Sequence, residues 1–352
     1  MILHIIPNDK FAPQFIDFIE KHYNYDEHRI VVLSYHGTIF VKNPQPNKVE
    51  LIYKNASSFY KLFWYMRSSN SIIVHGFFSR AVMALLIASR SIEKSYIVLW
   101  GGDFYCYRYE SKKRIQLMRY VLRRCRGIVT LLEEDYLLAK KWFGIKAQFF
   151  PCMLYYNCVI DNALPLFWKS RKCDDQLVVQ IGNSADPSND HISVLQELSR
   201  CSIENIQLII PLSYAGNPDY VKSVTSMTNS LFPGKARILT ELIPIEEYIE
   251  IQKGIDVAIF AHNRQQALGN IYSLLAMGKK VYLRPDITTY SSLIKQEITV
   301  YSIEDIQSTI CIEIPEALAQ KNQEIIKKMC SIEQLKRDWD AVFEDAHQKC
   351  GY

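Results

Sequence analysis

A buried strand, a polar loop and a helix follow one another in the second half of the chain. The apolar residues 257–260 run into the polar residues 261–268, and an apolar, helix-like stretch continues from Gly269 to Met277. Such a unit directs free backbone N–H groups and the positive end of a helix dipole at the carboxyl edge of a parallel sheet. The pattern predicts a site for a diphosphate.

A second loop of the same design opens this half of the chain. Apolar residues 177–181 precede the polar residues 182–191, and a helical pattern follows at residues 192–198. Two such loops in one α/β unit predict a nucleotide-sugar site. The expected donor-binding residues are Gly182, Asn183, Ser184 and Ser188 in this loop, and Arg264, Gln265, Gln266, Gly269 and Asn270 in the other.

Arg264 is also the catalytic candidate on the donor side. Cleavage of a sugar–diphosphate bond leaves negative charge on the leaving group, which fixed hydrogen-bond donors stabilise. The alternative is that Arg264 is a solvated loop residue and that Gly269 merely begins a helix. Tyr214 and Thr240 follow two further strands, where they could hold base and ribose, although a tyrosine beside a Gly-Asn-Pro turn needs no function.

His75 and Asp103 are the catalytic candidates in the first half. Each follows a predicted strand, so an imidazole or carboxylate there could accept or orient the proton of an acceptor hydroxyl. The alternative for His75 is a hydrogen-bonded core position, and for Asp103 it is the capping of the turn after Gly101-Gly102. Acids at positions 134 and 135 are better explained as helix caps.

A basic segment spans residues 108–126, with one acid and interleaved apolar residues. Such a helix can lie on an anionic membrane surface, and we expect Arg119, Arg123 and Arg124 to contribute to membrane or acceptor binding. The aromatic residues 59–67 could be a companion anchor. The alternatives are a solvated surface helix for the basic segment and a core helix for the aromatic one.

Short apolar runs separated by helical patterns must position these residues. They occur at residues 2–6, 30–33, 72–74, 96–100 and 128–132, and again at 177–181, 206–211, 236–239, 255–260 and 280–283. Buried strands of this kind predict parallel sheets covered on both faces. The expected fold class is α/β with the GT-B architecture, in which two Rossmann-like, doubly wound domains face each other across a cleft.

The expected domains follow from this alternation. An acceptor-binding domain is predicted at residues 1–155, an irregular linker at 156–175, a nucleotide-sugar-binding domain at 176–313 and a C-terminal helical segment at 314–352. The last segment is expected to be helical throughout, because its apolar residues recur at helical spacing.

Composition excludes several classes. The chain has 352 residues, 49% of them hydrophobic, and a net charge of +4, which is too balanced for a general nucleic-acid binder. Its nine cysteines have neither disulfide-framework nor zinc-site spacing, which indicates a reducing compartment. No secretion signal, membrane-spanning run or metal-ligand cluster is evident, so a cytoplasmic protein without a metal or other cofactor is expected.

Several of these motifs together resemble glycosyltransferase family 56. They are the segments 74–78, 99–105, 182–191 and 210–214, and residue 260 followed by 264–266 and 269; the resemblance runs from about residue 75 to 284. That family contains TDP-N-acetylfucosamine:lipid II N-acetylfucosaminyltransferases of enterobacterial common antigen synthesis. The resemblance implies a peripheral protein on the inner face of the cell membrane. It would move a deoxyamino sugar from a TDP- or UDP-linked donor to a polyprenyl-diphosphate-linked glycan.

The chain departs from the family pattern in its first half. Val98 replaces a histidine before Leu99-Trp100, and Phe77 stands where a polar residue is usual. In the second half, residues 273–275 lack the ribose-binding glutamate of many GT-B enzymes, so Asn270 or Ser273 would substitute. Two alternatives stay open, namely an epimerase or phosphorylase on the same frame, and a non-catalytic nucleotide-sugar-binding or scaffold protein of a glycan-assembly complex.

Overall fold

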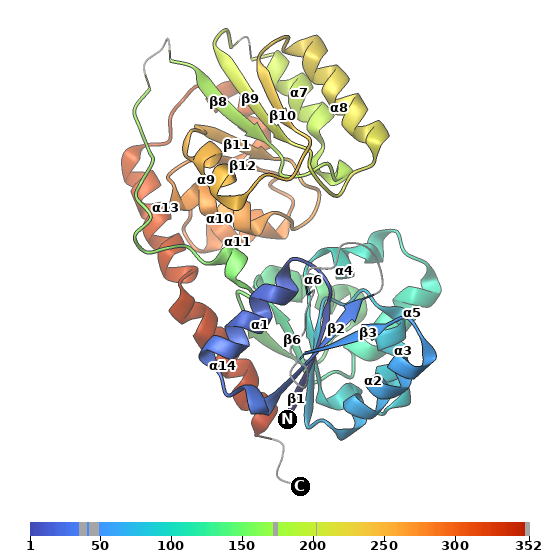
Figure 1. The fold of residues 1–352 in the computed structure, drawn as a ribbon. Helices are drawn as coiled ribbons and strands as arrows, with labels where there is room; N and C mark the ends of the chain where they lie inside the picture. Colours follow the sequence, from blue (N-terminus) through green and yellow to red (C-terminus); the bar gives the residue numbers. More distant parts are fainter. Residues whose placement is uncertain (35–40, 42–48, 172–174, 202, 349–352) are drawn as a thin grey trace. The chain divides into compact units, whose positions relative to one another are not determined.

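The structure is a computed structural model that describes residues 1–34, 41, 49–171, 175–201 and 203–348. These residues divide into two compact units. The first comprises residues 1–159 and 332–352, and the second comprises residues 160–331. Each unit is a parallel α/β sheet with helices on both faces (Figure 1).

The first unit contains a seven-stranded sheet in the order β3-β2-β1-β4-β5-β6-β7, and all of its pairings are parallel. Its strands are β1 (Ile2–Pro7), β2 (His28–Ser34), β3 (Val49–Tyr53), β4 (Ser71–His75), β5 (Ser95–Val98), β6 (Gly127–Thr130) and β7 (Gln148–Pro151). Its helices are α1 (Phe11–His22), α2 (Ala56–Ser68), α3 (Arg80–Ala88), α4 (Gly102–Tyr105), α5 (Lys112–Leu122), α6 (Glu133–Phe143) and α14 (Ile332–His347), with short 3₁₀ turns η1 (Tyr25–Glu27), η2 (Ile92–Lys94), η3 (Cys106–Arg108) and η4 (Tyr156–Cys158).

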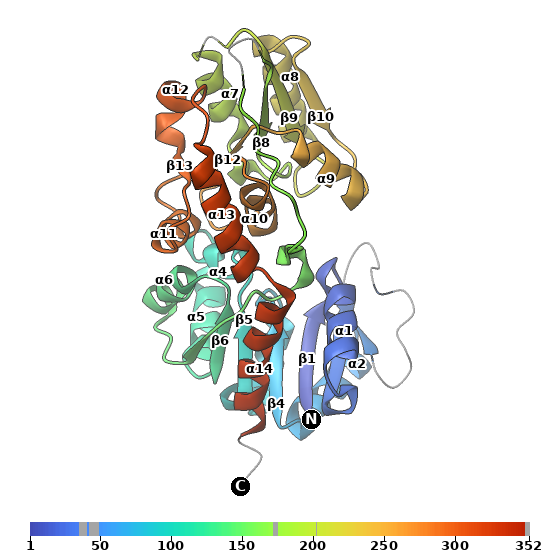
Figure 2. The ribbon, with the colours of Figure 1, turned by 90° about the vertical axis from the view of Figure 1, so that its left-hand side faces the viewer.

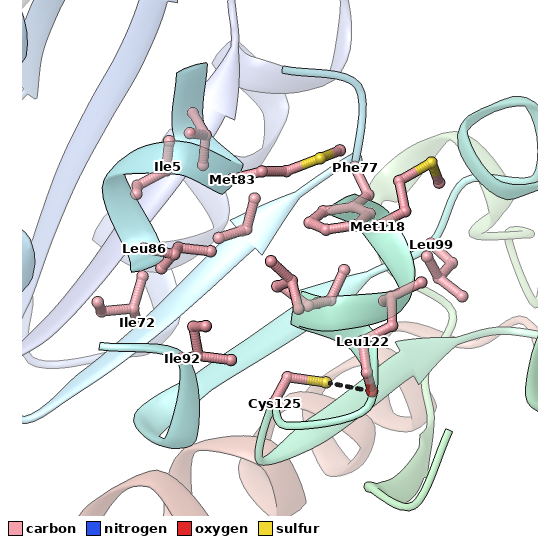
Figure 3. Close-up of a cluster of buried hydrophobic side chains, with 14 of the residues drawn as sticks. Ile5, Ile72, Phe77, Met83, Leu86, Ile92, Leu99, Met118, Leu122 and Cys125 are labelled. Atoms are coloured by element: carbon pink, nitrogen blue, oxygen red, sulfur yellow. Dashed lines mark hydrogen bonds between the residues drawn. The ribbon is translucent and has the colours of Figure 1, made fainter. Parts of the chain in front are cut away.

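The two faces of this sheet have different cores. On one face, α2, α3, α5 and α6 bury an aliphatic cluster in which Phe77 packs near Met118 and Leu99 (Figure 3). On the other face, α1 and α14 enclose an aromatic and histidine-rich core that includes Phe15 and Trp339. Figure 2 shows α14 lying along this second face. Period-two alternation in β1 explains the difference, because Leu3 and Ile5 point to the first core while His4 points to the second.

The second unit contains a six-stranded parallel sheet in the order β10-β9-β8-β11-β12-β13. Its strands are β8 (Leu177–Ile181), β9 (Ile206–Pro211), β10 (Ala236–Leu239), β11 (Val257–Phe260), β12 (Lys280–Leu283) and β13 (Tyr301–Ser302). Its helices are α7 (His191–Ser199), α8 (Pro218–Leu231), α9 (Ile245–Lys253), α10 (Leu268–Ala276), α11 (Thr288–Lys295), α12 (Ile306–Thr309) and α13 (Glu316–Met329), with 3₁₀ turns η5 (Pro187–Asn189) and η6 (Ile303–Asp305).

The structure differs from the expectation in the C-terminal segment and at the sheet edges. The segment is two helices with a break at residues 330–331, and α14 belongs to the first unit rather than to a separate C-terminal part. Three edge or near-edge strands, β3, β7 and β13, have no counterpart among the expected strands. Edge strands are partly exposed and short, so they lack a continuous apolar run.

Candidate functional site

The loop after β8 is shaped by Gly182. This glycine has φ +65°, and a Cβ atom there would lie 2.6 Å from both Asn189 Oδ1 and His191 Nε2, so no other residue fits. The backbone N–H of Asn183 donates to Asn189 Oδ1 at 3.0 Å. The Asn189 amide in turn donates to Ser184 Oγ at 3.3 Å, so the loop is closed by its own side chains.

The loop after β11 is joined to the first loop by His262. Its Nε2 atom lies 2.7 Å from Asn189 Oδ1 and 3.1 Å from Asn183 Oδ1. Because both partners are acceptors, Nε2 carries the proton. Burial lowers the pKa of His262 to about 3, with a smaller contribution from the charge of Arg264, so the ring is neutral. His262 is not among the predicted site residues, since a lone histidine at a strand end gives no signal of a partner 79 residues away.

Two further contacts fasten the loops together. Ser188 Oγ donates to Gln266 Oε1 at 2.8 Å. The guanidinium of Arg264 forms an ion pair with Asp186 at 3.1 Å, and both side chains are partly exposed. Arg264 is therefore held at the carboxyl edge of the sheet by a partner from the other loop, and is not a freely solvated residue.

The helix after this loop begins one residue earlier than expected. Ala267 has φ +60° and precedes α10, so the left-handed turn falls on an alanine and Gly269 is the second helical residue. Gln265 is almost buried, and its Oε1 atom has no hydrogen-bond partner among the described residues. Asn270 accepts a hydrogen bond from Gln252 at 3.2 Å and is thus turned toward α9.

A groove of about 630 Å³ brings Tyr214 and Thr240 together. It lies beside the loops that follow β9 and β10, and Ala185 from the first loop also lines it. The hydroxyl of Tyr214 accepts a hydrogen bond of 2.8 Å from the Asn183 amide, which connects the groove to the loop after β8. The second unit therefore gathers ten of the eleven expected donor residues into two interlocked loops and an adjoining groove, while Asn270 faces α9.

In the first unit, Asp103 caps the turn that contains Gly101 and Gly102, and it does not face an acceptor site. Its side chain is fully buried, and its carboxylate accepts hydrogen bonds from the backbone N–H groups of Phe77 at 2.8 Å and Trp100 at 3.0 Å. Burial raises the pKa of Asp103 to about 6, although these hydrogen bonds oppose the shift. In this position the carboxylate cannot contact an acceptor hydroxyl. It ties the loop after β4 to the loop after β5.

His75 takes the core alternative, within a buried row that we call the histidine chain: His28, His4, His75 and Tyr155. Neighbouring strands β2, β1 and β4 supply the three imidazoles, with nitrogen–nitrogen distances of 2.9 and 3.2 Å. His75 Nδ1 lies 2.8 Å from the Tyr155 hydroxyl. Both ring nitrogens of His75 are thus occupied inside the core, so it cannot act directly on an acceptor either.

The direction of donation along this chain follows from its last member. The indole Nε1 of Trp100 lies 3.0 Å from the Tyr155 hydroxyl and can only donate. The Tyr155 hydroxyl can in turn donate its proton to His75 Nδ1, the one acceptor that the structure gives it among the described residues. His75 then donates through Nε2 to His4, and His4 donates through Nε2 to His28. Burial lowers the pKa of His75 to about 3 and that of His28 to about 4, and it lowers the pKa of His4 as well.

The basic segment forms α5, but its apolar face is already in use. Met118, Val121 and Leu122 are buried in the first core, so the helix cannot insert into a bilayer by that face. Arg119 donates to the Trp142 carbonyl at 3.2 Å, and Arg124 stacks 4.0 Å from the Tyr120 ring centroid.

Of the three expected membrane or acceptor residues, Arg123 is the exposed cation for which the structure gives no such contact. In the described parts of the chain no helix is long and apolar enough to cross a bilayer. Within those same parts, no three His, Cys, Asp or Glu side chains are grouped to hold a metal ion.

Several solved structures of sugar-transferring enzymes have the same fold. A glycosyltransferase from Rickettsia africae matches with a TM-score of 0.69 at 12% identity, over 99% of this chain and 98% of that one. Anabaena HepE, solved with UDP and glucose, has a TM-score of 0.70 at 12% identity over 97% and 99% of the two chains. A sucrose-phosphate synthase from Thermosynechococcus elongatus has a TM-score of 0.70 at 9% identity over 98% of each chain.

The family model described as "4-alpha-L-fucosyltransferase glycosyl transferase group 56" matches residues 53–348. This match covers most of both units and includes the loops after β4, β5, β8 and β11. The expected fold class and family are thereby confirmed. The chain is a glycosyltransferase with the GT-B fold and belongs to family 56.

Proposed function

We propose that the second unit binds the nucleoside diphosphate of a TDP- or UDP-linked deoxyamino sugar through the interlocked loops after β8 and β11. The observation that carries this proposal is the bond from His262 to Asn183 and Asn189, which fixes both loops at one sheet edge. The fold neighbour solved with UDP and glucose supports a nucleotide-sugar donor.

In the proposed reaction, an acceptor hydroxyl oxygen bonds to the anomeric carbon while the bond from that carbon to the diphosphate breaks. The nucleoside diphosphate leaves with the electron pair, and the hydroxyl proton passes to solvent water. Arg264 and the free N–H groups of the first turn of α10 would stabilise the charge on the leaving group. Such donors can replace a divalent cation, so we expect a metal-independent reaction.

The groove that contains Tyr214 and Thr240 is the proposed site for base and ribose. It adjoins the first loop through Asn183, so a nucleotide could extend from the groove to Arg264 within one unit. Tyr214 is 38% exposed and offers a ring face for stacking.

We propose a polyprenyl-diphosphate-linked glycan as the acceptor and the inner face of the cell membrane as the place of reaction, in bacterial surface polysaccharide synthesis such as that of enterobacterial common antigen. The motifs shared with family 56 support the acceptor class. The contact with lipid would be electrostatic, through exposed cations such as Arg123, the residue that follows α5, because the apolar face of α5 is buried.

The test is a screen in two steps. UDP and TDP are titrated calorimetrically into the protein, and nucleotide sugars are then incubated with a lipid-linked acceptor in EDTA and analysed by mass spectrometry. A glycosylated acceptor with release of nucleoside diphosphate is expected. Turnover of the donor without an acceptor, or nucleotide binding that survives alanine substitution of both His262 and Arg264, would contradict the proposal.

A further inference from the structure

Three partly exposed aromatic rings meet at the carboxyl edge of the first sheet. Phe11 begins α1, Phe78 lies between β4 and α3, and Trp100 lies between β5 and α4. The Trp100 ring contacts Phe11 with a centroid distance of 5.2 Å and Phe78 with one of 5.7 Å, both at steep angles. We call these three residues the aromatic platform. It lies at the edge where ligands of open parallel sheets bind.

The backbone around the platform is held in place from below. Phe77, next to Phe78, is buried in the aliphatic core and anchors the loop (Figure 3). The Asp103 carboxylate binds the backbone N–H groups of Phe77 and Trp100 and so fixes the spacing of two platform residues. Gly76 has φ +73°, and a Cβ atom there would lie 3.0 Å from the Phe78 ring and 3.2 Å from that of Trp100. A glycine is what permits the two rings to approach.

The histidine chain fixes the orientation of the Trp100 indole and also uses its only polar atom. Because Nε1 donates to the buried Tyr155 hydroxyl, a ligand can contact Trp100 through its ring face but not through its N–H group. A row of buried imidazoles is costly unless every member is hydrogen-bonded. The histidine chain ends at the partly exposed Trp100 ring. Such an arrangement is expected where a binding surface must be rigid before the ligand binds.

Charged groups stand beside the rings. Asp9 is partly exposed, and its carboxylate accepts hydrogen bonds from the backbone N–H groups of Phe11, at 2.9 Å, and Ala12. A carboxylate has about four acceptor positions, so it can still accept a hydrogen bond from a ligand hydroxyl. The ammonium of Lys10 lies 5.2 Å from the Phe11 ring centroid. A sugar ring has an apolar C–H face and polar hydroxyls at its rim, so it matches an aromatic surface bordered by a carboxylate. A cation beside it suits an acceptor that carries a diphosphate.

We propose that the aromatic platform is the acceptor-sugar subsite, in which the sugar ring of the acceptor stacks on Trp100, contacts Phe78 with its edge and donates a hydroxyl hydrogen bond to Asp9. This inference rests on the proposed function, since it assigns the acceptor of that reaction. Asp103, Gly76 and the histidine chain are positioning residues in this assignment.

The first experiment separates acceptor from donor kinetics. Trp100→Leu and Phe78→Ala should each raise the acceptor KM about tenfold while leaving the donor KM unchanged. Tyr155→Phe releases the indole with little change in volume and should raise the acceptor KM less, and Trp100→Phe should restore part of the loss. Tyr109→Ala removes a 74%-exposed ring outside the platform and is the matched control. Equal changes in donor and acceptor KM would overturn the assignment.

The second experiment needs no turnover. Protein labelled with 5-fluorotryptophan is titrated with a short-chain polyprenyl diphosphate that carries one N-acetylhexosamine, and the Trp100 signal is assigned with Trp100→Phe. The sugar-bearing compound should shift the Trp100 signal, and the same prenyl diphosphate without sugar should not. A shift with both compounds, or with neither at saturation, would overturn the inference. UDP and TDP calorimetry on the same sample reports on the donor site separately, so failure of the platform and failure of the proposed function are distinguishable.

Discussion

The Nε2 atom of His262 lies 2.7 Å from the side-chain oxygen of Asn189, so the loop after β11 is hydrogen-bonded to the loop after β8 in the core of the second unit. Replacing His262 by Ala removes the donor and leaves two amide oxygens under-satisfied. We expect a loss of about 1–3 kcal/mol in unfolding free energy and a clear loss of nucleotide affinity. His347→Ala, on an exposed part of α14, is the control. Calorimetry with UDP or TDP on the folded variant measures the nucleotide affinity. An unchanged affinity would show that the hydrogen bonds from His262 between the two loops have no role in donor binding.

Arg264→Ala should weaken donor binding or slow transfer at least tenfold, because a charged hydrogen bond to phosphate contributes about 1.5–3 kcal/mol. Arg264→Lys should recover only part of this loss, since a single ammonium cannot serve Asp186 and a phosphate with the same geometry. The exposed Arg237, which pairs with Glu247 at 3.5 Å, is the control for removal of a cation from the same unit. A rate equal to that of the natural protein would defeat the assignment.

Asp103→Asn should lower transfer more than donor binding. The Asp103 carboxylate accepts hydrogen bonds from two backbone N–H groups, one in each loop. An asparagine has only one acceptor oxygen, and its N–H₂ group would face the other N–H. One of the two loops would therefore lose its hydrogen bond. Steady-state kinetics with both substrates varied measures the effect. If donor and acceptor parameters change together, Asp103 supports the unit as a whole and has no special relation to the acceptor.

Acidification should destabilise the protein below about pH 6.5. Burial lowers the pKa of His28 to about 4 and of His75 and His262 to about 3, so in this range the unfolded chain binds more protons than the folded one. Each such histidine contributes a loss of up to about 1.4 kcal/mol per pH unit. Asp9 and Asp103 have pKa values raised to about 6, so they bind protons in the folded state and offset part of this loss at lower pH.

Urea unfolding between pH 7.5 and 5 measures this dependence. The slope should become shallower in His28→Asn, which removes one of the titrating rings. A stability that is constant from pH 7.5 to 5.5 would show that the buried imidazoles are not held neutral.

Arg123→Ala should reduce binding to anionic vesicles in a salt-sensitive way, because an exposed cation near such a surface contributes about 1 kcal/mol. Arg119→Ala should act mainly on stability, since its guanidinium is bonded to the Trp142 carbonyl. Vesicle sedimentation at two salt concentrations, together with thermal unfolding, separates the two effects. Identical binding to neutral and anionic vesicles would count against electrostatic docking.

The sequence predicted the fold better than the roles of single residues. Central strands such as β8 and β11 are continuous apolar runs and were placed correctly, whereas the edge strands β3 and β7 expose part of their surface and carry no such signal. The loops after these strands lie at the carboxyl edge of the sheet as predicted, because the topology of a parallel sheet brings these loops to one edge.

What the sequence could not provide is the direction in which a side chain points. His75 ends β4 and Asp103 follows β5 in α4, but both side chains turn inward, and their partners Tyr155 and Phe77 are set by tertiary packing. His262 was overlooked for the same reason. Its partners lie 73 and 79 residues away, and no local pattern encodes such a distance.

The return of α14 to the first unit has a consequence during protein synthesis. Trp339 packs against Phe15 and His75, and Arg126 pairs with Asp345, so residues of α14 complete a surface whose other residues are translated much earlier. While the ribosome translates the second unit, which is about half of the chain, α14 is still absent. The face of the first sheet that carries aromatic and histidine side chains therefore stays exposed during that time. Nascent chains arrested before residue 332 should therefore recruit chaperones that bind exposed apolar surface, and the first unit should close only after α14 has emerged from the ribosome.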